Sequence, residues 1–110
     1  MTVYISQEMR GRDISNAFEY GEVEILVPAK IPIYEVRGPI NRVSKAVEKK
    51  LTNFSPVKDY LLLAGDPIAI GIACAYVSDI TGGFFRVLKW DRLENRYHPV
   101  LIDLYGEYNE

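Results

Sequence analysis

The sequence has few of the side chains from which catalytic and metal centres are most often built. Its 110 residues include one cysteine, one histidine and one tryptophan. A single cysteine, Cys74, excludes an intramolecular disulfide and a zinc site made of several cysteines. Cys74 lies in an apolar segment without a charged neighbour, so we expect a core side chain and not a reactive thiol.

The only histidine, His98, has no partner at a recognisable metal-ligand spacing. We expect it to lie at the surface, and we predict no metal, no cofactor and no catalytic residue. Aspartates do gather at or near the ends of the expected strands, where carboxylates can meet for acid–base or metal chemistry. Solubility and turn formation explain the same positions, which are Asp59, Asp66, Asp91 and Asp103.

The chain has no excess of charge of one sign and no long hydrophobic run. The formal net charge is -2 and the pI is about 5.4, which gives no global attraction to nucleic acid. The longest apolar stretch, residues 67–77, is shorter than the ~20 residues that a membrane span needs. The first residues lack a positively charged segment followed by an apolar core, so we expect a cytoplasmic protein without membrane contact.

Hydrophobic residues nevertheless make up 48% of the chain and charged residues 25%, as is usual for a folded protein. The length fits one hydrophobic core. We therefore assign residues 1–104 to a single domain and residues 105–110 to an acidic C-terminal tail.

Residues 59–83 carry the most informative pattern, which predicts a buried strand, a tight turn and a buried helix. The strand Tyr60–Ala64 ends at Gly65. Asp66 can cap the helix, and Pro67 fits its first position. The helix is apolar on nearly every side, so we expect the sheet to cover part of it and a further surface, such as another subunit, to cover the rest. Its apolar residues are Ile68, Ile70, Ile72, Ala73, Cys74, Ala75, Tyr76, Val77 and Ile80.

Two strands and a short helix are expected before this segment. Thr2–Ser6 and Val23–Val27 are rich in β-forming residues. Between them, Asp13 can cap a helix over Ile14–Tyr20 that stops at a left-handed Gly21. A crossover through this helix makes the two strands parallel. A hairpin-like packing is the alternative.

An irregular passage, Ala29–Val36, leads to an amphipathic helix. Gly38-Pro39 opens this helix and Ser55-Pro56 ends it. Apolar residues recur in it every three or four positions, at Ile40, Val43, Val47, Leu51 and Phe54.

The C-terminal part predicts an antiparallel hairpin after Gly82-Gly83 has stopped the second long helix. Its strands are Phe84–Trp90 and Arg96–Leu104. Pro99 cannot donate a backbone hydrogen bond, so the last strand belongs at the sheet edge. The alternation of strands and helices predicts a three-layer α/β sandwich of the Rossmann-like or flavodoxin-like type, with a mainly parallel sheet that ends in an antiparallel hairpin.

One candidate site lies where parallel strands end. If the first strand and Tyr60–Ala64 are neighbours, Gly65 and Asp66 face a group of polar residues across a crevice, and a helix N-terminus there attracts anions. These residues are Ser6, Gln7, Arg10, Arg12 and Asp13, of which the two arginines add positive charge. A phosphate or a nucleotide would suit this arrangement. The segment lacks the glycine run and the Lys-Ser/Thr pair of a phosphate loop, and Asp66 is also explained as a helix cap alone.

The hairpin is a second candidate site, because it combines cations with aromatic rings. Such a patch can stack single-stranded bases or anchor a protein interface. Cross-strand packing of the rings, with solvated arginines, explains the same residues. They are Lys89, Trp90, Arg92, Arg96 and Tyr97.

Three stretches of the sequence together resemble a group of small proteins encoded by tailed phages of aquatic bacteria. They are Asp13-Ile14-Ser15 with Glu19-Tyr20-Gly21-Glu22, then Asp59-Tyr60-Leu61-Leu62-Leu63 with Gly65-Asp66-Pro67, and finally Leu88-Lys89-Trp90-Asp91. The resemblance covers most of the chain, and it implies no activity that can be transferred residue by residue. It implies an accessory factor that engages a host or phage macromolecule, or a small virion component.

We therefore expect a non-enzymatic interaction or assembly module that self-associates or binds a host or phage protein. The alternatives are a nucleotide- or anion-binding domain, with or without enzymatic activity, and a protein that binds single-stranded nucleic acid.

Overall fold

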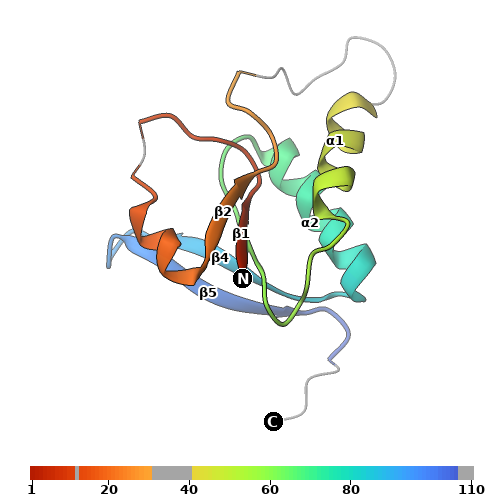
Figure 1. Cartoon of the computed structure of the whole chain (residues 1–110). Helices are drawn as coiled ribbons and strands as arrows, with labels where there is room; N and C mark the ends of the chain where they lie inside the picture. The colour runs from red at the N-terminus through yellow and green to blue at the C-terminus, as the bar shows by residue number, and fades with distance from the viewer. Residues whose placement is uncertain (12, 31–40, 107–110) are drawn as a thin grey trace.

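Five strands form one mixed sheet in the order β2-β1-β3-β4-β5 (Figure 1). The computed structural model describes residues 1–11, 13–30 and 41–106. The strands β1 to β4 run parallel to one another, and β5 pairs antiparallel with β4. The strands are β1 Thr2–Ile5, β2 Glu22–Ile25, β3 Tyr60–Leu62, β4 Phe84–Asp91 and β5 Arg96–Asp103. The predicted α/β fold with its C-terminal hairpin is confirmed.

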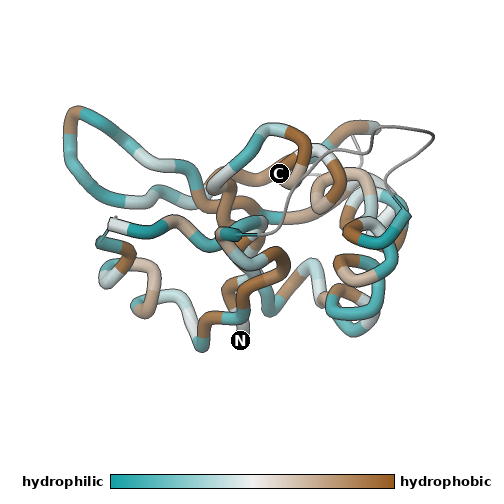
Figure 2. Tube along the Cα trace, turned by 90° about the horizontal axis from the view of Figure 1, so that it is seen from above, coloured by the Kyte–Doolittle hydropathy of each residue, from teal (hydrophilic) through white to brown (hydrophobic). Residues whose placement is uncertain are grey.

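Helices cover both faces of the sheet. The helices α1 (Asn41–Leu51) and α2 (Pro67–Thr81) lie on one face, and the 3-10 helix η1 (Ser15–Tyr20) lies on the other (Figure 1). Each face has its own apolar cluster, one built around the two α-helices and one around Ala17 of η1. In Figure 2, hydrophobic residues gather mainly at the centre of the trace and hydrophilic residues in the outer loops.

The turn from β3 into α2 follows its sequence signals closely. The Asp66 carboxylate accepts a hydrogen bond of 2.8 Å from the Ile68 amide, and Pro67 is the first helical residue. Gly82 is the C-cap of the helix. Among the described residues, neither α-helix combines the length and the apolar content that a membrane crossing requires.

The segment between β1 and β2 differs from the prediction in two details. It forms a 3-10 helix in which the Asp13 carboxylate accepts from the Ser15 amide, while Ile14 occupies the N-cap position. These bonds lower the pKa of Asp13. Gly21 has φ 144° and not the left-handed value expected for a helix stop. A Cβ there would come within 2.5 Å of the Met1 carbonyl oxygen, so the close strand pairing requires glycine.

The strands β1 and β2 are parallel, so the hairpin-like alternative is wrong. The helix α1 ends at Leu51, before the predicted stop at Ser55-Pro56, although Phe54 still packs into the core. The expected helix start at Gly38-Pro39, Ile40, and most of the irregular passage Ala29–Val36 lie outside the described residues.

Candidate functional site

The strand order brings together the ends of β1 and β3, as the crevice prediction requires. Here the order of the sheet reverses, since β2 lies on one side of β1 and β3 on the other. Ser6 joins the two strand ends. Its hydroxyl accepts from the Ala64 amide at 2.8 Å and donates to the Ala64 carbonyl oxygen. The site residues predicted on the β3 side, Gly65 and Asp66, follow directly after this link.

The side chain of Gln7 occupies the space between these strand ends. Its Oε1 accepts from the Asp66 amide at 2.7 Å, and its Cβ would lie 2.4 Å from a Cβ added to Gly65. The Gly65 amide donates to the sulfur of Met9. Together with the Ile68 amide, which donates to Asp66, three donors of this turn are thus directed at acceptors of the protein itself.

The two arginines predicted for the same crevice contribute no described contact to it. Arg10 is exposed, and Arg12 lies outside the described residues. The anion site at Arg10, Arg12, Gly65 and Asp66 therefore stays a prediction.

The hairpin residues separate into two groups. Trp90 and Tyr97 are cross-strand partners whose ring centroids lie 5.0 Å apart at an interplanar angle of 68°. Tyr97 is fully buried, so its ring packs inside the molecule. Arg96 forms an ion pair of 3.5 Å with Glu19, while Lys89 and Arg92 are exposed. The Trp90 and Tyr97 rings therefore show the cross-strand packing that was the alternative explanation for these residues.

An apolar hollow lies beside α2, over the face of the sheet where β4 pairs with β5. It measures about 370 Å³. Nearly all of its lining is hydrocarbon, and it is formed by Leu63, Cys74, Ala75, Ser78, Phe85, Val87, Ile102 and Leu104. Burial raises the pKa of the Cys74 thiol, which keeps the side chain neutral at physiological pH.

A stripe along α2 continues this apolar hollow to the surface. Ile68 is 49% exposed, and Gly71 and Ala75 are exposed as well. A further hollow between α1 and α2 is lined by Ile72 and again by Ala75. Ala75 therefore forms the ridge between two concave regions. We use the name "α2 surface" for the stripe Ile68, Gly71, Ile72 and Ala75 together with the apolar hollow.

The helix of this surface was predictable from the sequence, but the strand residues beside it were not. Ile102 and Leu104 lie two positions apart and so share one face of β5 and its extension. Their partners across the hairpin are part of the same apolar row, since Phe85 pairs with Ile102. The period of two in the last strand was the signal for this row.

The family model described as phage Pam3 gp32-like protein matches residues 1–104. The chain belongs to the phage Pam3 gp32-like family. It is thus a phage-encoded protein, and the family match extends over all five strands and both α-helices. No curated protein and no solved structure matches it.

Proposed function

We propose that this member of the phage Pam3 gp32-like family is a non-enzymatic accessory protein that acts by association through the α2 surface. One observation carries the proposal. The apolar helix α2 is covered by the sheet and by α1, and among the described residues its remaining side stays open. The buried residues Ala69, Ala73 and Val77 face the core, while Ile68 and Ala75 face outward. Contiguous exposed apolar surface next to a concave region is typical of protein interaction sites.

A second copy of the chain is the partner that we propose. Gly71 and Ala75 are exposed on α2 and have little or no side chain, so the backbone of a second helix can approach closely there. Ile68 and Ile72 flank these small residues and can pack across a two-fold axis. The net charge of -2 opposes such an association only weakly.

The outer edge of β5 is less suited to association by strand pairing. The Tyr97 amide points outward and donates to Asn16 Oδ1 at 3.3 Å. Pro99, two positions further on the same side, has no amide hydrogen to offer. Association by strand pairing at this edge is therefore disfavoured, and we expect contact through the face of the sheet, where the apolar hollow lies.

Substitution of Ala75 tests this proposal. Ala75→Glu places a charge on the ridge of the α2 surface but keeps a strong helix former at an exposed position. Leu93→Glu is the matched control, since Leu93 is 97% exposed at the tip of the hairpin. We expect size-exclusion chromatography with light scattering to give a dimer or larger species for the wild type and for L93E, and a monomer for A75E.

Equal masses for the wild type and A75E at all concentrations would contradict self-association through the α2 surface. If both are monomers and a phage or host protein binds the wild type but not A75E, the α2 surface is the binding site, and its partner is that protein and not a second copy of the chain.

Two finer expectations belong to this proposal. The resemblance noted in the sequence supports tailed phages of aquatic bacteria as the source, and it supports the cytoplasm of the infected cell as the place of action. We do not assign nucleotide binding, because the donors of the turn at Gly65 and Asp66 already have acceptors. We do not assign single-strand binding either, because the Tyr97 ring is buried.

A further inference from the structure

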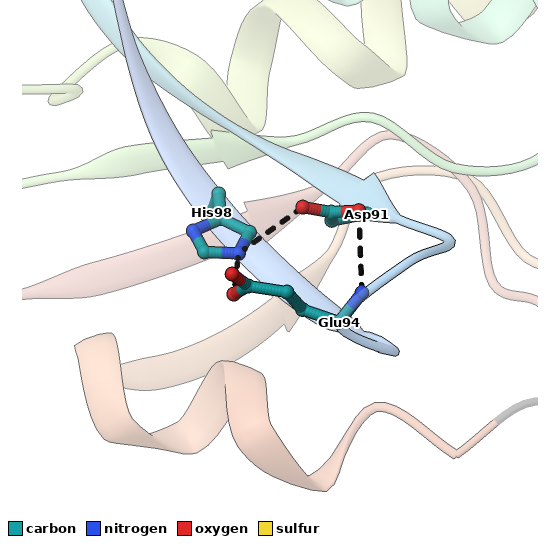
Figure 3. A group of neighbouring side chains, drawn as sticks. All are labelled: Asp91, Glu94 and His98. Atoms are coloured by element: carbon teal, nitrogen blue, oxygen red, sulfur yellow. Dashed lines mark hydrogen bonds and ion pairs between the residues drawn. The ribbon is translucent and has the colours of Figure 1, made fainter.

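The hairpin between β4 and β5 brings together three side chains that the proposed function does not use. Asp91 is the last residue of β4, Glu94 lies in the turn, and His98 belongs to β5 (Figure 3). One ligand atom of each lies within 4.8 Å of the others. We propose that Asp91, Glu94 and His98 bind a divalent transition-metal ion.

The distances in this group resemble those within a coordination shell. His98 Nε2 lies 2.7 Å from Glu94 Oε2 and 3.4 Å from Asp91 Oδ2. With metal–ligand bonds of about 2.1 Å, neighbouring ligand atoms stand roughly 3.0–3.4 Å apart. The Glu94 side chain is 59% exposed, so a small rotation opens the space that an ion needs.

A hydrogen atom on His98 Nε2 cannot form good hydrogen bonds to both carboxylates at once. Nε2 carries at most one hydrogen, whereas oxygens of two carboxyl groups face it (Figure 3). A metal ion accepts electron pairs from Nε2 and from both oxygens at the same time. Binding to Nε2 requires the imidazole to carry its hydrogen on Nδ1.

The backbone holds two of the three ligands in place. Asp91 Oδ1 accepts from the amides of Leu93 at 2.9 Å and Glu94 at 3.4 Å, which leaves Oδ2 directed toward His98. His98 is fixed on β5 opposite Lys89 of β4. Ligands that are oriented before the ion arrives lose little conformational entropy on binding.

The donor set indicates the kind of ion. One imidazole and two carboxylates suit Zn²⁺, Mn²⁺, Co²⁺ or Ni²⁺ better than they suit Ca²⁺, which prefers ligand sets made of oxygen alone. A hollow of about 380 Å³ beside the group has room for water ligands. Lys89 and Arg92 also line it, and their positive charges lower the affinity for a cation.

Nuclear magnetic resonance gives a direct test, because the chain has a single histidine. Its imidazole signals can be followed without ambiguity while Zn²⁺ is added. We expect a saturable shift of the His98 signals that identifies Nε2 as the bound nitrogen. Mn²⁺ should broaden the same signals, and the fluorescence of the only tryptophan, Trp90, should respond to Co²⁺.

Charge-neutral variants define the ligands. Glu94→Gln and Asp91→Asn should weaken Zn²⁺ binding by about tenfold or more, as expected when a ligand is lost. Asp91→Asn keeps the side-chain oxygen that accepts from the turn. Lys89→Gln should tighten binding, and Glu48→Gln, exposed on α1, should leave it unchanged.

Unchanged His98 signals with millimolar Zn²⁺, Mn²⁺ and Co²⁺ would overturn the site. Equal affinity of E94Q, D91N and the wild type would overturn it as well, because the ion would then bind elsewhere. Neither result depends on the oligomeric state, so the metal site and the proposed association can fail separately.

Discussion

Gly65 shows at the scale of a single residue how closely β1 and β3 are joined. Its φ is 89°, in the region that favours glycine, and the side chain of Gln7 fills the space where a Cβ would stand. The sequence predicted a turn at Gly65 and a cap at Asp66, because both depend on local signals. It also placed Gln7 opposite Gly65 and Asp66, but only the structure shows the Gln7 side chain accepting from the Asp66 amide, since that contact joins residues 59 positions apart.

Alanine at Gly65 should therefore destabilise the fold. We expect Gly65→Ala to lower the free energy of unfolding by about 2–4 kcal/mol, through backbone strain and collision with Gln7. Gly82→Ala is the matched control, because Gly82 also has a positive φ, of 67°, but an added Cβ there meets no atom within 4 Å. It should cost only about 1 kcal/mol, through backbone strain alone. Urea denaturation at one protein concentration measures both, and equal effects of the two substitutions would contradict this account.

At the scale of elements, the strands and helices with strong local patterns were predictable. The helix α2 has a capping aspartate, a proline at its first position and a glycine at its end, and all three act as expected. The segment between β1 and β2 has weaker signals, and its residues Ser15–Tyr20 form a 3-10 helix instead of the expected helix over Ile14–Tyr20. The tip of the hairpin was predicted as a turn, but the grouping of Asp91, Glu94 and His98 needs the register of the two strands.

The cap of α2 can be tested at this scale. Asp66→Ala removes the acceptor of the Ile68 amide, so we expect a loss of about 1 kcal/mol in the free energy of unfolding. Asp66→Asn keeps a side-chain oxygen and should lose less than Asp66→Ala. Thermal or urea unfolding of the two variants provides the comparison. A loss as large in Asp66→Asn as in Asp66→Ala would show that the negative charge, and not the cap, stabilises the turn.

At the scale of the whole molecule, the class of fold followed from the sequence but the order of the strands did not. Pairing of β3 with β1 joins segments more than fifty residues apart, and no local pattern specifies it. The same limit applies to the α2 surface. The sequence showed that α2 is apolar on nearly every side, but the sides covered by α1 and by the sheet are set by tertiary packing.

We propose that this phage Pam3 gp32-like protein works by association through the α2 surface, without a small-molecule substrate. A native mass spectrum of the purified protein tests it most directly, because it reports the number of subunits and any retained ligand together. We predict a dimer or larger species without the mass of a nucleotide or phosphate ester. A monomer at every concentration, or a subunit that carries such a mass, would contradict the claim and return attention to the crevice at Gly65 and Asp66.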